Sequence, residues 1–416
     1  MAWKYRYTVL AVLGGGYFLS YVDRMVMAST IPFIAQDFHL SPTLVGAILS
    51  AFFLGYALMQ IPGGLLADRY GPRVVLTASI MWWSLMTALT GVAPGLTAML
   101  VIRTVFGLGE GPFPAAASKC LSIWFPTQEI GRANGLLLGA TYVGATVAPL
   151  LVTAMIVPLG WRAVFYVLLI PGVVLGLLLW RYAANGPAVA QHPSRENPLE
   201  DSPAEAALLH VKANFLRSLR APGVLWCAAS FFLANTVAWG LTNWLPTYLL
   251  QAWKFPVAKM GVFAAVTNLA GAVGFMLGGY LCDRYFTDRL RVPIIVGLLT
   301  SAVFTYLAAV APSGEWAVAA LVLVFLFSNI AFTALLTLPL VLVPKETVGA
   351  AYGVVNTAGQ LSGVLAPLLV GYLLDLTGNS FRVVLYTMMV LAAVAMYPAG
   401  RIRQTMDPAT RYESAT

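Results

Sequence analysis

Four charged residues stand inside long apolar stretches of the sequence: Asp23 and Arg24 lie in the first stretch, and Arg103 and Glu110 in the fourth. A charge at bilayer depth is costly and normally persists only where it faces a cavity and takes part in function. Residues seven apart on an α-helix lie on nearly one face, about 10 Å apart along the axis. Arg103 and Glu110 would therefore share a face, with Gly107 between them where another group could approach. Each pair taken alone could be a structural salt bridge, but two such pairs favour a transport pathway.

These residue types suit the binding of an organic anion and the binding of a proton. A guanidinium group is a planar fork that binds a carboxylate through two hydrogen bonds and stays protonated, as Arg24 and Arg103 would. A buried carboxylate beside an arginine can take up a proton when another anion draws the arginine away. The three histidines of the chain fall in predicted loops, so Asp23 and Glu110 are left to carry any proton through the membrane.

The composition shows what kind of element must position these groups. Hydrophobic residues make up 60% of the 416 positions and charged residues only 10%, whereas soluble domains carry about 25% charged residues. The chain is therefore predicted to be an all-α integral membrane protein. Apolar stretches of about 20 residues can each span a bilayer, and twelve are predicted: 8–35, 44–66, 74–94, 96–120, 133–157, 162–183, 222–250, 260–282, 292–311, 316–342, 350–374 and 381–400.

The distribution of basic residues predicts the orientation. With the N-terminus inside, 18 of the 24 Lys and Arg residues lie on the cytoplasmic side, so both termini are expected to be cytoplasmic and the protein to lie in the inner (cell) membrane. The net charge of +8 is then largely a topology signal, and no nucleic-acid partner is expected. The first stretch is too long for a signal peptide and has no small-residue cleavage pattern, so it is expected to remain as a helix.

The sequence divides into two similar halves. Residues 126–152 align without gaps on residues 344–370, including matched Pro and Gly positions, and the segment 64–69 recurs at 279–284. Two pseudo-symmetric six-helix bundles are therefore predicted over 1–183 and 222–403. A polar, proline-containing cytoplasmic linker is expected over 184–221 and a cytoplasmic tail over 404–416. Internal repeats with the binding site between them are common in secondary transporters.

The motifs resemble those of a known family. The loop after the second stretch, with Gly64, Asp68, Arg69, Gly71 and Arg73, is similar to the loop motif of the major facilitator superfamily. Within that superfamily the chain resembles the anion:cation symporter family of bacterial sugar-acid/proton symporters and vesicular glutamate and sialic acid carriers. The features that carry this second resemblance are the segment 21–24, the spacing of Arg103 and Glu110, and the segment 244–248.

The resemblance implies roles for individual residues. The matching arginines of the family, Arg24 and Arg103 here, hold or gate the anionic substrate, and the residues matching Asp23 and Glu110 are its proton-linked carboxylates. The matching tyrosines lie at the substrate. Four polar or amphipathic residues in the seventh and eleventh stretches are expected to complete the substrate site, or else to hydrogen-bond between helices. The predicted substrate-binding set is Tyr21, Arg24, Tyr56, Arg103, Trp239, Asn243, Asn356 and Gln360.

The repeated loop motif has a different predicted role. Charged residues at the ends of helices can pair with helix termini and hold the outward-facing conformation of an alternating-access cycle. This gating set consists of Asp68, Arg69, Arg73, Asp283 and Arg284.

The predicted function is import of a small organic carboxylate, such as a sugar acid, by proton symport. A proton-coupled drug or metabolite antiporter is one alternative, although membrane arginines would repel cationic drugs. A polytopic membrane sensor is another, but the chain has no signalling domain. No phosphate-binding loop, metal-ligand spacing or nucleophile–base set occurs, so no enzyme, ATP-driven pump, metal or cofactor is predicted. The expected partners are the acid, protons and the lipid bilayer, and the chain is expected to act as a monomer.

Overall fold

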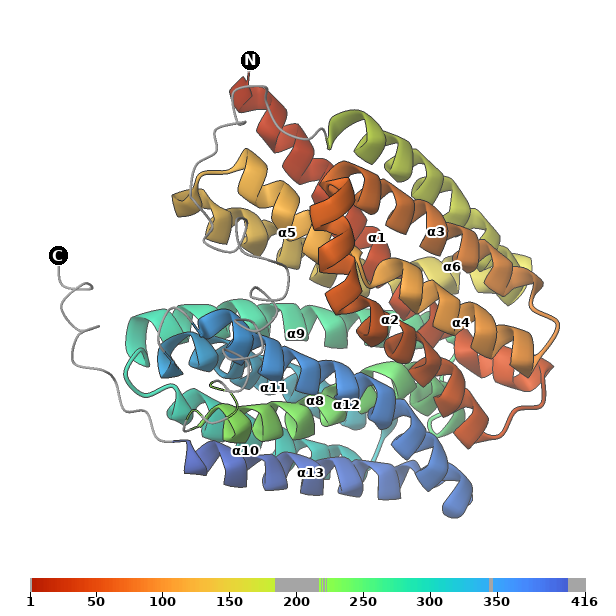
Figure 1. Cartoon of the computed structure of the whole chain (residues 1–416). Helices are drawn as coiled ribbons and strands as arrows, with labels where there is room; N and C mark the ends of the chain where they lie inside the picture. Colours follow the sequence, from red (N-terminus) through yellow and green to blue (C-terminus); the bar gives the residue numbers. More distant parts are fainter. Residues whose placement is uncertain are drawn as a thin grey trace. The chain divides into compact units, whose positions relative to one another are not determined.

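The computed structural model describes residues 2–183, 217, 219, 221, 223–343 and 347–402, and these are folded as α-helices joined by short connections (Figure 1). Most of the predicted linker and all of the predicted tail lie outside the described residues. The helices are α1 (Ala2–Asp37), α2 (Pro42–Tyr70), α3 (Pro72–Val92), α4 (Leu96–Glu110), α5 (Phe113–Trp124), α6 (Thr127–Tyr182), α8 (Val224–Gln251), α9 (Val257–Tyr285), α10 (Arg291–Ala309), α11 (Gly314–Leu342), α12 (Val348–Leu376) and α13 (Phe381–Arg401).

The helices agree with the predicted membrane spans. Within the described residues, 10 helices are long and apolar enough to cross a bilayer. One of them, α6, contains two spans, because Gly160 leaves the helical conformation with φ 76° and ψ 166°. The short helices α4 and α5 together make one further span, which brings the described residues to the twelve that the sequence predicts. Their ends fall within a few residues of the predicted ones, except that α1 and α6 each begin six residues early.

The fourth predicted span, 96–120, is not one continuous helix. It is interrupted after Glu110, and α5 begins at Phe113. Pro112 accounts for the break, because proline has no backbone N–H to donate and its ring crowds the preceding turn. Glu110 is therefore the last residue of α4 and lies directly at the interruption.

Local sequence signals explain other helix boundaries. Ser41 precedes α2, and its hydroxyl accepts from the backbone N–H of Leu44 at 3.5 Å, while Pro42 occupies the first helical position. Gly71 separates α2 from α3 with a positive φ of 80°, a conformation that favours glycine. Pro94 and Gly95 separate α3 from α4, as predicted.

The described helices form two compact units, and each is considered by itself. The first unit comprises Met1–His192, Gly240–Leu269 and Val364–Phe381. In it α1 packs on α6, α3 packs on α6 and α2 packs on α4. The start of α2 also contacts α12, where the backbone N–H of Thr43 donates to Asp375 at 2.8 Å. The four buried charges predicted from sequence all belong to helices of this unit.

The second unit comprises Pro193–Trp239, Ala270–Gly363 and Arg382–Thr416. Its core is a cluster of buried apolar side chains from α8, α9, α10, α11, α12 and α13, in which Phe231 and Phe332 pack edge to face. Polar groups in this core bond to backbone carbonyls. The hydroxyl of Ser230 donates to the carbonyl of Ala395 at 2.9 Å, which ties α8 to α13.

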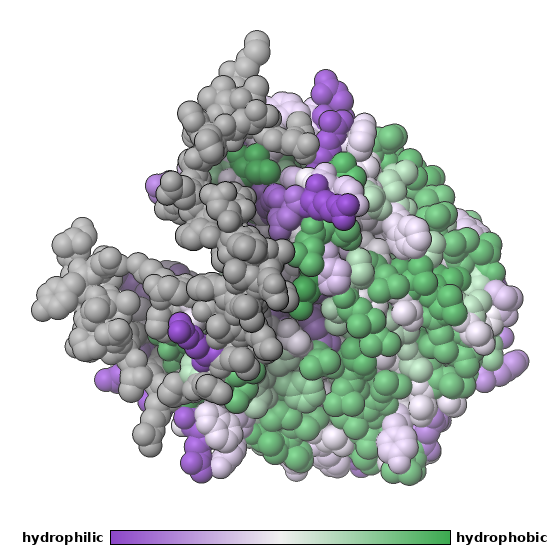
Figure 2. Space-filling view, in the orientation of Figure 1, coloured by the Kyte–Doolittle hydropathy of each residue, from purple (hydrophilic) through white to green (hydrophobic). Residues whose placement is uncertain are grey.

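The surface of the helices is largely apolar. Figure 2 shows hydrophobic residues, in green, spread over the face where Figure 1 places α3 and α4. Side chains such as Ile61 and Met276 are 80% and 76% exposed. Apolar patches of this extent are not found on soluble monomers, and they suit contact with lipid.

Candidate functional site

The candidate site is built from α1, α2 and α4 of the first unit. Asp23, Arg24, Arg103 and Glu110 are all buried, with no more than 8% of any of these residues exposed. Each lies well inside its helix or at the α4 interruption, so the backbone holds all four in place. The structure therefore brings together the charges that the sequence places in two separate stretches.

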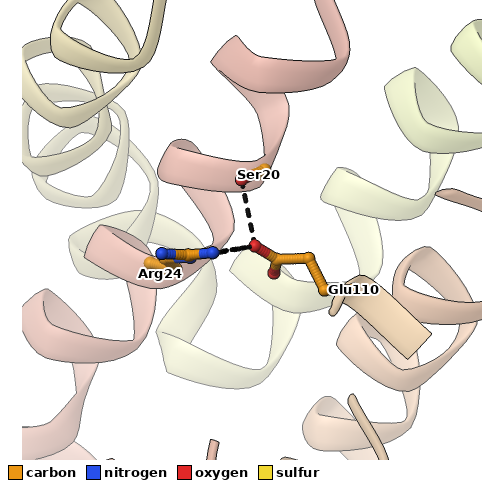
Figure 3. Close-up of polar contacts among 3 residues, drawn as sticks. All are labelled: Ser20, Arg24 and Glu110. Atoms are coloured by element: carbon orange, nitrogen blue, oxygen red, sulfur yellow. Dashed lines mark hydrogen bonds and ion pairs between the residues drawn. The ribbon is translucent and has the colours of Figure 1, made fainter. Parts of the chain in front are cut away.

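The ion pair in the centre of the site joins Arg24 to Glu110. Arg24 Nε donates to Glu110 Oε1 at 2.9 Å, and Arg24 Nη2 donates to the same oxygen. The hydroxyl of Ser20, one helical turn before Arg24, donates to that oxygen at 3.0 Å. Figure 3 shows the two side chains of α1 converging on this single oxygen of the carboxylate.

This pairing differs from the pairs suggested by the sequence, in which Asp23 accompanies Arg24 and Arg103 accompanies Glu110. Adjacent residues on a helix point in different directions, so Asp23 and Arg24 do not face each other. Arg103 and Glu110 share a face but are about 10 Å apart along the axis. Asp23 instead accepts a hydrogen bond from the Thr87 hydroxyl of α3 at 3.3 Å.

Arg103 makes no ion pair within 4 Å in the described part of the chain. It is only 3% exposed, and its Nε has no hydrogen-bond partner there. Its guanidinium carbon lies 4.6 Å from the ring centre of Phe106 and 5.4 Å from that of Phe52. A buried guanidinium that contacts mainly aromatic faces retains donors for a carboxylate.

Glu110 also has an unused polar atom. Its Oε2 is buried and has no hydrogen-bond partner among the described residues, whereas Oε1 accepts three hydrogen bonds. A buried polar atom without a partner is energetically costly. Protonation of Oε2 would turn this atom into a donor and lower that cost if an acceptor were brought near.

Aromatic rings enclose the guanidinium of Arg24. Its central carbon lies 5.0 Å from the ring centre of Tyr21, 4.8 Å from that of Phe52 and 4.6 Å from that of Tyr56. The structure thus places both predicted tyrosines at Arg24, and Phe52 lies near both arginines. The sequence analysis missed Phe52, although it lies one helical turn before Tyr56 and so on the same face of α2.

Gly107 does not leave an opening between the two charges of α4. A Cβ atom at this position would lie 2.2 Å from the backbone oxygen of Phe52 and 2.7 Å from the nitrogen of Tyr56. The backbone of α2 occupies the space, so the glycine permits close packing of α2 on α4, and the group that approaches between the two charges is α2 itself. Close packing at Gly107 brings the two rings of α2 next to the charges.

The remaining predicted substrate residues lie on α8 and α12. Asn243 is buried in the first unit, while Trp239, Asn356 and Gln360 are half-buried in the second unit. Their participation in a substrate site stays a prediction. A polar residue that the sequence analysis missed is Asn235, whose side-chain amide donates to the carbonyl of Gly359 at 2.9 Å and ties α8 to α12 within the second unit.

The predicted gating residues lie at helix ends. Asp68 pairs with Lys119 of α5 at 2.8 Å, a partner that the sequence analysis did not identify. The guanidinium of Arg69 lies 5.3 Å from the ring centre of Tyr70, and that of Arg73 lies 4.3 Å from Trp180. In the second unit, Asp283 and Arg284 lie at the end of α9 and make no ion pair with the described residues.

Comparisons with known proteins place this chain in a family. The model of the Major Facilitator Superfamily matches residues 13–367. The chain is 31% identical to a probable sulfoacetate transporter of Cupriavidus necator, over 90% of this chain and 89% of that protein. It is 28% identical to a hexuronate transporter of Bacillus subtilis, over 87% and 86% of the two chains.

Solved structures agree on the fold. A bacterial homologue of the human lysosomal transporter Spinster superposes with a TM-score of 0.83 at 21% identity, covering 96% of this chain and 98% of that one. A D-xylose–proton symporter superposes with a TM-score of 0.76 at 15% identity, with the same coverage. The predicted all-α, two-bundle membrane fold is therefore confirmed, and the chain is an integral membrane transporter, not an enzyme, that belongs to the Major Facilitator Superfamily.

Proposed function

We propose that the protein imports a small organic carboxylate together with protons, by alternating access. In this proposal Arg103 binds the anion, and Glu110 and Asp23 carry the protons. The supporting observation is that the buried charges of the candidate site are only partly paired with one another. One buried arginine is paired with one buried carboxylate, while Arg103 has no carboxylate within 4 Å among the described residues.

Arg103 suits an anionic substrate for two physical reasons. Leaving a buried guanidinium without a counter-ion is costly, so an incoming carboxylate would relieve that cost. The planar fork would bind both carboxylate oxygens and orient the acid. The relatives are named for sulfoacetate, hexuronate, galactonate and galactarate or glucarate. These compounds are all organic acids, which favours this substrate class over the cationic drug of the alternative antiporter.

Coupling to protons follows from competition for the arginines. An anion that enters the site attracts Arg24 as well as Arg103, and this weakens the hold of Arg24 on Glu110 Oε1. The carboxylate then binds a proton more readily, since a buried charge without its partner is strongly disfavoured. Release of the anion restores the ion pair and expels the proton. Asp23, with its hydrogen bond from Thr87, is the second proton carrier in this scheme.

The proposal keeps the orientation, oligomeric state, membrane and coupling ion that the sequence predicts. Both termini lie in the cytoplasm, the protein works as a monomer in the inner membrane, and protons are the coupling ion. The distribution of Lys and Arg supports the orientation.

Binding to an Arg103→Lys variant tests the proposal. Purified protein is screened by thermal shift and calorimetry against glucarate, a hexuronate and sulfoacetate. Lysine keeps the charge but loses the fork, so affinity should fall by at least about tenfold, the loss expected for a charge-assisted hydrogen bond. Arg162→Lys is the matched control, because Arg162 forms an exposed ion pair with Asp37 at 2.7 Å. Unchanged affinity in Arg103→Lys would remove Arg103 from the site, and failure of the native protein to bind any acid would refute the substrate class.

A further inference from the structure

An apolar cavity of about 380 Å³ lies in the first unit, and none of the four buried charges lines it. It is formed by one face of α2, one face of α3 and the interruption between α4 and α5. Pockets that hold small molecules have volumes of roughly 300–1,000 Å³, so this cavity is large enough for part of a ligand. Its lining includes Met59, Leu66, Val74, Ala78, Trp82 and Leu108.

The wall of the cavity is held in place by specific contacts. The indole Nε1 of Trp82 donates to the backbone oxygen of Val105 at 3.0 Å, which ties α3 to α4. A Cβ atom on Gly109 would lie 1.9 Å from Trp82 Cδ1, so the indole lies directly against the backbone of α4. The polar atom of the indole is satisfied by this bond, and its ring is left to form an apolar wall.

The cavity opens on the apolar surface of the helices. Trp82, Tyr70 and Val74 line it and are 46%, 51% and 41% exposed. Figure 2 shows that the face carrying α3 and α4 is largely hydrophobic. In an integral membrane protein such a face contacts lipid, so hydrocarbon chains are the molecules that meet this opening.

Positive charge gathers at one end of the cavity. Arg69 packs at 5.3 Å on the ring of Tyr70, which lines the cavity. Arg73 directly precedes the lining residue Val74, and its guanidinium lies 4.3 Å from the ring centre of Trp180. Neither arginine forms an ion pair within 4 Å in the described ranges, and Arg73 Nε is buried without a hydrogen-bond partner. The neighbouring carboxylate of Asp68 pairs with Lys119 at 2.8 Å and forms no ion pair with either arginine.

From these observations we propose that the cavity binds an anionic phospholipid. One acyl chain lies along the α2–α3 cavity, and the phosphate contacts Arg69 and Arg73 at the α2–α3 junction. The ligand must be an amphiphile, because the charge lies at one end only and the far end, at Trp82 and Leu108, is apolar. A soluble organic acid would find no charged partner inside the cavity, whose lining is apolar except for Ser79 and Tyr70. Basic residues near a membrane surface attract anionic lipid, each by about fivefold in affinity.

Native mass spectrometry of the purified full chain tests this assignment. The protein is titrated with phosphatidylglycerol or with phosphatidylethanolamine, and the bound lipid is counted after mild detergent removal. The native protein should retain phosphatidylglycerol at least about fivefold more strongly than phosphatidylethanolamine. Arg69→Gln combined with Arg73→Gln should abolish that preference. Equal retention of the two lipids by the native protein, or a preference that survives in the double variant, would overturn the headgroup assignment.

A second pair of variants tests the acyl-chain position. Ala78→Trp fills the cavity and should lower the retention of both lipids. Leu85→Trp is the matched control, because Leu85 is 47% exposed on the same helix and does not line the cavity. If Ala78→Trp retains lipid as well as Leu85→Trp does, the chain does not lie in this cavity. The readout is bound lipid, so its result is independent of the proposed transport function.

Discussion

The two oxygens of Glu110 have different surroundings, and the proposed coupling depends on that difference. Oε1 accepts hydrogen bonds from Ser20 and twice from Arg24, whereas Oε2 has no partner among the described residues. The ion pair holds the carboxylate in position, and in the proposed coupling the second oxygen takes the proton. A carboxylate with both oxygens fully bonded would resist protonation more strongly.

The stability of the Arg24–Glu110 pair can be tested directly. Glu110→Ala leaves a buried arginine without its partner, which should lower the free energy of unfolding by about 3–5 kcal/mol. Asp37→Ala breaks the exposed pair with Arg162, whose side chains are both more than 40% exposed, and should cost no more than about 1 kcal/mol. Thermal unfolding of the detergent-purified variants checks this. Equal losses for the two variants would contradict the structural role of the buried pair.

Sequence reasoning identified the charged residues but not their partners. Buried charges in apolar stretches stand out in composition, so Asp23, Arg24, Arg103 and Glu110 were identifiable from residue types alone. Their pairing depends on how α1 is rotated against α4, and spacing along one helix carries no information on that rotation. Ser20 was missed for the same reason, since a serine in a membrane helix acquires a role only when a partner helix faces it.

At the scale of helices, glycines determine how closely α2 approaches α4. A Cβ atom at Gly55 would lie 2.1 Å from the backbone oxygen of Thr104, and one at Gly107 would lie 2.2 Å from that of Phe52. These two reciprocal contacts bring backbone against backbone at the level of the arginines. Small residues at helix interfaces are the usual means of such packing in membranes.

Gly107→Ala tests whether the close packing of α2 against α4 matters for stability and binding. The added methyl group meets backbone, which cannot move as a side chain can, so the variant should lose about 1–3 kcal/mol of stability and bind substrate more weakly. Gly135→Ala is the control, because no atom lies within 4 Å of a Cβ atom there. The measurement is the melting temperature of each variant. A Gly107→Ala variant as stable as Gly135→Ala would show that α2 and α4 do not need this contact.

Helix lengths were predictable, and helix interruptions were predictable only in part. Apolar length predicts a membrane span, and pairs of breakers such as Pro94 and Gly95 mark its ends. The interruption at Pro112 was missed because the apolar stretch continues through it, and proline inside membrane helices is often tolerated. Gly160, in contrast, falls in the gap that the sequence predicts between two spans.

At the scale of the whole molecule, we expect the loop motif to control the balance between conformations. Asp68→Asn removes the pair with Lys119 at the end of α2 and should shift the transporter toward inward-facing states. Labelling of a cysteine placed at Thr43, on the expected periplasmic side, should then decrease. The background for this measurement is a chain with its three native cysteines replaced, namely Cys120, Cys227 and Cys282.

Lys119→Met provides the matching control for that experiment. It removes the other partner of the same ion pair, so it should shift labelling in the same direction, and the double variant should add little to either single one. Unchanged labelling in both single variants would show that the pair does not hold the outward-facing state.

The central claim is that Glu110 and Asp23 couple substrate movement to protons, and transport by Glu110→Gln combined with Asp23→Asn tests it most directly. Glutamine keeps an acceptor for Ser20 and Arg24 but cannot gain or lose a proton. In proteoliposomes the double variant should therefore support counterflow of a bound acid without a pH gradient and fail to accumulate that acid when a pH gradient is imposed. Asp37→Asn, an exposed control, should do both. Accumulation of the acid by the double variant in response to the pH gradient would contradict the proposed mechanism.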